Sequence, residues 1–447
     1  MFASIFALVM FSAVLIWVGS LYRDKTDVVD FHLAGRSAGT IKIAAATFTL
    51  IGGGELVTLT ALSYAYGAWS LLFFGGVVLG FVILAMLAKQ ARQNASNSGF
   101  LSLSDYFYAN FGVAGSIAAT VLACISLGAL LLIQFVVGGM MLESSTGLPQ
   151  WACIIGMAAV ICAYVWLGGL NGVFATDYMQ AVTMFGTIAI LVILYAASAG
   201  SSESVTVVSS FPPLGDAAVL VLGGVFAVLG GADVWQRVLA ARDDAAARKG
   251  LLWNSVGWLL FGILIVVLAL QIKARFPNAD PSDAFMTMLR GGLPNWLAAM
   301  ATLLIFAAVL STAEIEIFVI SVLINKEITR FRKGKKVSTS GTRLYIIAVT
   351  FVGGLFAMFF QQLVSIYFLL LYFMMILGPV ALARLLGRGA PTLTVLGIVG
   401  GVSVLVALFF LDRMTGAYPL LILCPPLIAF LGRGRTVHPS SGTPSHD

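Results

Sequence analysis

The segment 308–316 sets a serine and a threonine beside two carboxylates inside a long apolar run. On a helix, Ala308, Ser311 and Glu314 share one face because they are three residues apart. Thr312 and Glu316, four residues apart, share the adjoining face. Such hydroxyls often only donate to the carbonyls of their own helix. Next to carboxylates they also offer the hard oxygen ligands that a small cation prefers, so the segment is a candidate cation site.

Five carboxylates lie in or at the edges of apolar runs: Glu55, Asp177, Asp233, Glu314 and Glu316. A carboxylate facing lipid at the centre of a helix would cost roughly 2.5–3.5 kcal/mol, so these side chains should face a bundle interior or an aqueous cavity. No Lys or Arg lies near the middle of any run. The balancing charge must therefore come from bound ions, protons or a substrate. Asp177 is expected near the end of its run, where water can hydrate it.

Glycine clusters interrupt two of the apolar runs. Glycines 52–54 lie near the middle of the run 40–65, and glycines 223–224 and 230–231 lie in the run 217–239. Small residues can simply allow close packing of membrane helices. Backbone groups freed from a helix in lipid must, however, be satisfied within the protein. Interrupted helices at corresponding places of two repeats are typical of the midplane binding site of a secondary transporter.

The composition sets the class of protein. Of the 447 residues, 60% are hydrophobic and only 10% are charged, whereas a soluble domain carries about 25% charged residues. The apolar runs are about twenty residues long, as membrane-spanning helices require. Continuous runs exclude an outer-membrane barrel, which alternates over about ten residues. No nucleophile and base are arranged for covalent catalysis, so the chain is not expected to be an enzyme.

The apolar runs predict an all-α polytopic membrane protein with thirteen spans. They are 2–21, 40–65, 67–88, 113–142, 151–168, 172–198, 217–239, 251–271, 295–325, 343–361, 363–386, 391–411 and 416–431. Spans two to six and seven to eleven form two groups of five, and because five is odd the groups run in opposite senses. We therefore divide the chain into an N-terminal helix and loop (1–39), a first repeat (40–198), a second inverted repeat (217–386), two C-terminal helices (391–431) and a disordered cytoplasmic tail (432–447).

The basic residues predict the orientation. With the N-terminus outside and the C-terminus in the cytoplasm, 21 of the 25 Lys and Arg residues lie on the cytoplasmic side, as the positive-inside rule requires. This distribution accounts for the net charge of +6 without a nucleic-acid partner. The first span has no basic region before it and no cleavage site after it, so a retained helix is expected rather than a signal peptide.

Four segments of the chain resemble motifs of the sodium:solute symporter family. They are DFHLAGR at 30–36, GGL at 168–170 with TDYMQ at 176–180, QRVLAARD at 236–243, and Ala308 with Ser311 and Thr312. Members of this family carry sugars, amino acids, sialic acid, vitamins, carboxylates and iodide. The resemblance implies the inverted-repeat fold of the leucine transporter, in agreement with the two groups of five spans.

The resemblance also implies site residues. Sodium would be bound by the hydroxyls of Ser311 and Thr312 and by three carbonyls, those of Ala308, Phe48 and Ile51. Asp177 falls where some members complete a second sodium site with two more hydroxyls, but this chain has Glu314 and Ile315 there. Glu314 would then serve as a second cation or proton site. Substrate contacts are expected at the two interrupted helices, from Gly53, Gly54, Glu55 and Asp233.

The function predicted from the sequence is sodium-coupled symport of a small polar organic solute across a bacterial-type inner (plasma) membrane. The carboxylates would repel a solute that presents only negative charge, so a zwitterionic, cationic or neutral hydroxylated solute is expected. An amino acid or derivative is favoured slightly over a sugar. We expect a monomer in the lipid bilayer that binds no cofactor besides the coupling ion. Two alternatives stay open: proton coupling, and a membrane sensor that works with a separate signalling partner.

Overall fold

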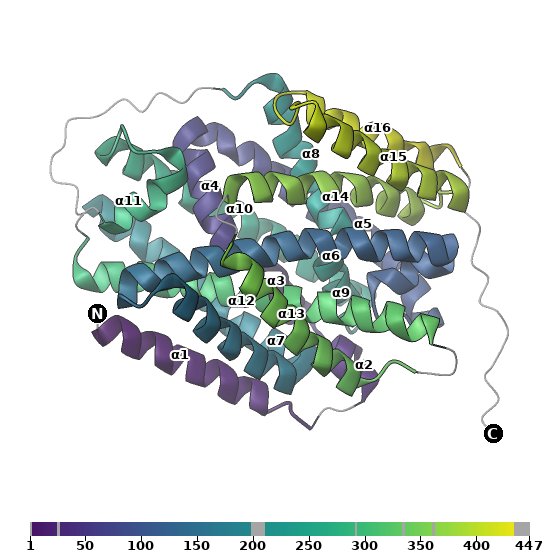
Figure 1. Cartoon of the computed structure of the whole chain (residues 1–447), viewed down its shortest axis with the longest axis horizontal. Helices are drawn as coiled ribbons and strands as arrows, with labels where there is room; N and C mark the ends of the chain where they lie inside the picture. The colour runs from purple at the N-terminus through teal and green to yellow at the C-terminus, as the bar shows by residue number, and fades with distance from the viewer. Residues whose placement is uncertain are drawn as a thin grey trace.

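The fold of the described chain is entirely helical. The computed structural model describes residues 2–24, 27–197, 211–290, 293–332, 336–359 and 363–432. Long helices lie side by side across the molecule (Figure 1). Within these ranges the β-structure is limited to an isolated parallel bridge between Ala38 and Ala241. The predicted tail from residue 433 onward lies outside the described residues.

The helices follow the apolar runs closely. Their bounds are α1 Phe2–Ser20, α2 Val28–Leu33, α3 Thr40–Phe48, α4 Gly53–Tyr66, α5 Leu71–Ser98, α6 Leu103–Thr146, α7 Gln150–Ala197, α8 Leu214–Gly230, α9 Ala232–Ala240, α10 Asp244–Arg275, α11 Ala284–Arg290, α12 Asn295–Phe331, α13 Thr339–Ala357, α14 Leu363–Leu385, α15 Pro391–Phe410 and α16 Cys424–Leu427. Short 3₁₀ turns join several of them, including η3 Pro281–Asp283 between α10 and α11.

The predicted count of thirteen spans is not confirmed. Within the described residues, eight helices are long and apolar enough to cross a membrane, and α8 with α9 would make a ninth. Two predicted spans, 151–168 and 172–198, lie within α7, which consists of two helical segments joined across a kink at Gly169 (φ 52°, ψ −152°). The first predicted span and the last are short apolar segments, Ile5–Ser20 and Tyr418–Leu431. The kink in α7 falls between the predicted spans 151–168 and 172–198, while the total of thirteen spans stays a prediction.

Both interrupted helices predicted from the glycine clusters are present. In the first, α3 ends at Phe48, α4 begins at Gly53, and Gly52 between them is extended (φ −73°, ψ 173°). In the second, α8 and α9 are bent by 45° at Gly231. Gly224, by contrast, lies within α8, where an added Cβ would come within 2.8 Å of the Phe73 carbonyl. Close packing against α5 therefore explains Gly224.

Helix α12 forms the centre of the bundle. The most apolar stretch of α12 is 94% buried, and the helix packs against α6, α7 and α13. It also packs against α4 and α9, the second halves of the two interrupted helices. A helix buried on every side can carry carboxylates only where they face protein or an internal cavity. Glu314 and Glu316, in the middle of α12, are both fully buried.

Two of the family-like segments meet beside α2. The Ala38 amide donates to the Ala240 carbonyl at 3.1 Å, and the Arg242 amide donates to the Ala38 carbonyl at 2.8 Å. The Gln236 side-chain amide donates to the His32 carbonyl at 2.7 Å. The loop before the first repeat is thus tied to the end of the second interrupted helix.

His32 should make folding stability depend on pH. Its ring nitrogens lie 2.7 Å from the Val28 carbonyl and 2.7 Å from the Thr342 hydroxyl. Burial lowers the pKa of His32 from 6.5 to about 4. A lowered pKa favours the neutral ring in the folded state, so this contribution is complete above pH 6.5 and is lost as the pH falls toward about 4. At pH 5 the loss is about 2 kcal/mol.

We expect His32→Gln to reduce the loss of thermal stability between pH 7.5 and pH 5, measured by unfolding in detergent. The variant keeps a polar side chain but removes the titrating ring. An unchanged pH slope in the variant would show that His32 is solvated or charged in the folded protein.

Candidate functional site

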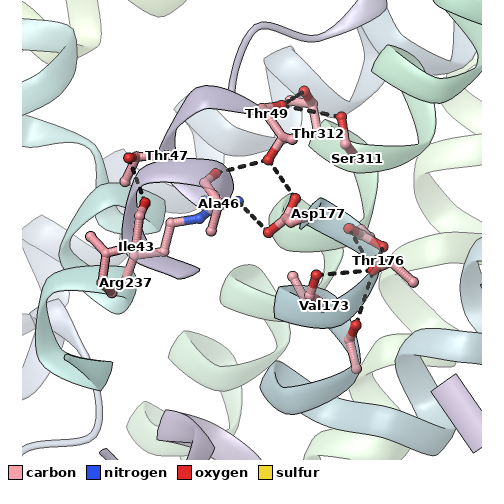
Figure 2. Close-up of polar contacts among 12 residues, drawn as sticks. Ile43, Ala46, Thr47, Thr49, Val173, Thr176, Asp177, Arg237, Ser311 and Thr312 are labelled. Atoms are coloured by element: carbon pink, nitrogen blue, oxygen red, sulfur yellow. Dashed lines mark hydrogen bonds and ion pairs between the residues drawn. The ribbon is translucent and has the colours of Figure 1, made fainter. Parts of the chain in front are cut away.

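The first helix break is joined to α12 by two hydroxyls. The Ser311 and Thr312 hydroxyls lie 3.2 Å and 3.0 Å from the Thr49 carbonyl (Figure 2). The Ser311 hydroxyl also lies 2.9 Å from the Ala308 carbonyl. All these side chains are buried. Carbonyl and hydroxyl oxygens therefore converge at the break. Together they form a set of hard ligands that suits a small cation.

Within the break, the carbonyl that both hydroxyls contact is that of Thr49 and not one of the two predicted there, Phe48 and Ile51. The Phe48 carbonyl accepts a hydrogen bond from the Ile51 amide at 3.1 Å, in a turn that follows the end of α3. This turn points the Thr49 carbonyl at α12. Phe48 and Ile51 lie in the same break, so their assignment as sodium ligands stays a prediction, and Thr49 joins the candidates.

Asp177 lies directly behind the break and is paired. Its Oδ1 accepts a hydrogen bond from the Thr49 hydroxyl at 2.5 Å, and its Oδ2 lies 3.3 Å from Nη2 of Arg237 (Figure 2). Both side chains of the ion pair are fully buried. Two expectations from the sequence were wrong: Asp177 is fully buried rather than exposed to water at the end of its run, and a basic side chain does balance one of the carboxylates. The physical reason is the bend at Gly231, after which all of α9 is buried.

Glu314 contacts Thr176, the residue that precedes Asp177 in α7. The Thr176 hydroxyl lies 3.1 Å and 3.0 Å from the two carboxylate oxygens of Glu314, and 2.9 Å from the Val173 carbonyl. One hydroxyl carries one proton, so it can donate to only one of these acceptors at a time. The predicted pair of Asp177 and Glu314 is thus brought close together by consecutive residues of α7. Their role in binding a cation or proton stays a prediction.

Glu55 is fixed by a glutamine of α6. Nε2 of Gln134 donates to Oε2 of Glu55 at 2.9 Å, and Oε1 of Gln134 accepts from the Gly54 amide at 2.9 Å. An added Cβ at Gly54 would lie 2.1 Å from Ile133, and one at Gly53 would lie 2.3 Å from Val309. These two glycines let α4 approach α6 and α12, and their assignment as substrate contacts stays a prediction.

Glu55 and Asp233 line one internal cavity of about 70 Å³. Each comes from the first turn of the second half of an interrupted helix, α4 for Glu55 and α9 for Asp233. The other walls are mostly apolar and aromatic. The two predicted substrate carboxylates are therefore brought together, whereas Gly53 and Gly54 do not line this cavity.

Several polar residues of the site were not singled out from the sequence. Thr49, Gln134 and Arg237 make the hydrogen bonds described above, and Gln180 of α7 has both amide atoms buried without a hydrogen-bond partner in the described structure. Gln134 had a usable signal, because it is a polar residue within an otherwise apolar run. Arg237 and Gln180 lie in the family-like segments.

Comparison with known proteins agrees with this architecture. The family model for the sodium:solute symporter family matches residues 31–387. The chain is 23% identical over 331 residues to the sodium/pantothenate symporter of Haemophilus influenzae, covering 68% of this chain and 67% of that protein. It is 23% identical over 351 residues to the human sodium/iodide cotransporter, covering 70% and 53%.

A solved structure shares the fold over nearly the whole chain. It is the substrate-bound, outward-open state of a Na+-coupled sialic acid symporter, with a TM-score of 0.80 at 17% identity, covering 97% of this chain and 98% of that one. Family and relatives are transporters, not enzymes. The family match covers most of the chain, and on that ground the protein belongs to the sodium:solute symporter family.

Proposed function

We propose that this protein imports a small polar organic solute together with sodium by alternating access. The observation that carries the proposal is the convergence of the Ser311 and Thr312 hydroxyls on the Thr49 carbonyl at the break between α3 and α4. A sodium ion bound between these oxygens would hold the interrupted helix against α12. The break also carries Glu55, so binding of the ion would complete the solute site.

The membrane potential makes such coupling effective. At about 150 mV, inside negative, one inward sodium ion contributes about 3.5 kcal/mol. This energy alone can concentrate a neutral solute a few hundredfold, before any sodium gradient is added. The proposed direction assumes the N-terminus outside and the C-terminus in the cytoplasm, as the distribution of basic residues indicates. The two interrupted helices, α3–α4 and α8–α9, support the two inverted groups of five helices.

The cavity supports a solute that is not purely anionic. Carboxylates such as Glu55 and Asp233 accept hydrogen bonds from hydroxyl and ammonium groups and repel negative charge. An amino acid or derivative is therefore favoured slightly over a sugar, and simple dicarboxylates should be poor solutes.

The test is solute uptake into proteoliposomes that hold the purified protein. Amino acids, sugars and carboxylates are offered under an inward sodium gradient, an inward proton gradient, or neither. Uptake that follows the sodium gradient supports the proposal. Uptake of the same solute under a proton gradient alone would show that protons, rather than sodium, are the coupling ion.

Proton coupling is the second candidate, and the surroundings of Glu314 favour it. The carboxylate is fully buried beside Asp177, and the Thr176 and Tyr164 hydroxyls are its hydrogen-bond partners. Two buried carboxylates at such close range favour the binding of a cation or a proton between them.

We expect Glu314→Gln to change the ion or pH dependence of uptake at least several-fold. The Gln side chain is neutral and does not titrate, so it can neither take up a proton nor attract a cation by its charge. The measurement is the half-saturating sodium concentration at pH 6 and pH 8. If Glu314 only accepts a hydrogen bond from Thr176, both dependences should survive in the variant.

A further inference from the structure

Three adjoining cavities, called here the path, lead toward the paired carboxylates. The outer, middle and inner chambers have volumes of about 1020, 280 and 70 Å³. Leu62, Tyr66, Leu220 and Phe368 line both the outer and the middle chamber. Phe73, Tyr367 and Leu371 line both the middle and the inner chamber. The three chambers therefore adjoin one another from the outer chamber to Glu55 and Asp233.

The charged side chains along this path are all acidic. Asp216 and Asp412 line the outer chamber, Asp280 lines the middle one, and Glu55 and Asp233 line the inner one. Among the described residues that line the three chambers there is no Lys or Arg. A cleft lined by one sign of charge between low-dielectric walls concentrates ions of the opposite sign. The path therefore favours cations over its whole length.

The middle chamber offers polar groups of its own. Thr58 lies three residues after Glu55 on the same face of α4, and its hydroxyl is buried without a hydrogen-bond partner in the described structure. A threonine within a helix usually donates to a carbonyl of the preceding turn, so a hydroxyl left without a partner is available to a ligand. The Ser282 hydroxyl and amide lower the pKa of Asp280, which keeps this carboxylate ionised.

Aromatic side chains complete the inner chamber. Phe73 lies with its ring centroid 6.1 Å from that of Tyr367, and Phe81 lies 6.1 Å from Trp258. All four rings line the inner chamber and are buried. The negative face of an aromatic ring attracts ammonium groups, most strongly where water is excluded. Buried carboxylates beside such rings suit an organic cation better than a sugar, which brings no charge to offset them.

We propose that the solute is a small organic cation, namely an ammonium compound without a carboxylate of its own. Its charge would lie between Glu55 and Asp233 against the aromatic rings, and a hydroxyl or amine would reach Thr58. The carboxylate of a zwitterion would instead meet an acidic path with no basic partner among its described lining residues. This inference rests on the proposed symport and, within it, favours an ammonium compound over the amino acid favoured above.

The test compares compounds of similar size that differ in charge. One set is choline, its neutral isostere 3,3-dimethylbutan-1-ol and the zwitterion glycine betaine. The other is ethanolamine, ethylene glycol and glycine. Thermal stabilisation of the purified protein is titrated with each compound at one fixed sodium chloride concentration. In at least one set, we expect the cation to reach half-saturation at a concentration at least tenfold below both counterparts.

Variants then test whether the preference for the cation depends on the carboxylates of Glu55 and Asp233. Glu55→Gln and Asp233→Asn keep the shape of each side chain and remove its charge, so each should reduce the preference for the cation at least tenfold. Glu143→Gln is the matched control, because Glu143 is exposed near the end of α6 and lines none of the chambers. It should keep the full preference. Equal or tighter binding of the zwitterions, no binding of any cation, or an unchanged preference in both variants would overturn the proposal.

Failure of this proposal can be distinguished from failure of the proposed symport. Sodium-driven uptake of a zwitterion, sugar or anion would leave the symport intact and refute the cationic solute. Binding of the cations without any effect of sodium on stability or uptake would refute the symport and leave the cation site standing.

Discussion

Replacing Ser311 and Thr312 together by alanine is expected to raise the half-saturating sodium concentration at least a hundredfold. Each hydroxyl is a neutral ligand oxygen, and an interaction with a charged group contributes about 1.5–3 kcal/mol. Removing two of them costs the ion about 3–6 kcal/mol by this reckoning. The fold should survive, because each change removes one small hydroxyl group. The Thr49 carbonyl loses two hydrogen-bond donors, and the packing of α12 around it stays the same.

The measurement is stabilisation of the purified protein by sodium chloride against potassium chloride, followed by sodium-driven uptake. Ser321→Ala is the matched control. Ser321 is equally buried on α12, but its hydroxyl donates to the Ile317 carbonyl of its own helix at 2.6 Å. Sodium dependence should be unchanged in the control. Unchanged sodium dependence in the double variant would refute the site at the break.

The helix breaks could be predicted from the sequence because glycine clusters are unusual in an apolar membrane-spanning run. Backbone groups released in a membrane need partners within the protein, so glycines 52–54 and 230–231 stood out against the apolar background. The hydroxyl pair on α12 could be predicted for the same reason. These features depend on local composition and on spacing along one helix.

The details of the site depend on geometry that local patterns do not contain. Which carbonyl meets the hydroxyls is decided by the turn after α3, where the Ile51 amide occupies the Phe48 carbonyl and leaves that of Thr49 pointing at α12. A shift of one residue in this turn would change the ligand. Spacing along the chain cannot resolve such a shift.

The position of Arg237 could not be predicted from charge patterns either. Positive residues near the ends of apolar runs are normally cytoplasmic, and Arg237 lies near the end of the run 217–239. The 45° bend at Gly231 instead carries α9 into the bundle, where Arg237 meets Asp177. A long-range ion pair between α7 and α9 requires knowledge of the fold.

This ion pair supplies the largest expected effect on stability. Arg237→Met should destabilise the protein by about 3–5 kcal/mol, since it leaves Asp177 as an uncompensated buried charge. Asp177→Asn should also destabilise the fold, because Nε and Nη1 of Arg237 already lack hydrogen-bond partners in the described structure. The double variant should recover much of the loss, as two neutral side chains then face each other. Unfolding in denaturing detergent measures all three.

The exposed pair Arg242–Asp243 is the control for this cycle. Its two side chains lie 2.9 Å apart but are 69% and 45% exposed, so Arg242→Met should cost less than about 1 kcal/mol. If Arg237 and Asp177 balance each other's charge, the double-mutant cycle should give a coupling energy well above 1 kcal/mol.

A coupling as small as that of an exposed pair would mean that another cation neutralises Asp177 when Arg237 is absent. In that case the coupling should fall further when sodium replaces potassium in the assay. Such a fall would identify Asp177 as a ligand for the transported ion rather than as a structural partner of Arg237.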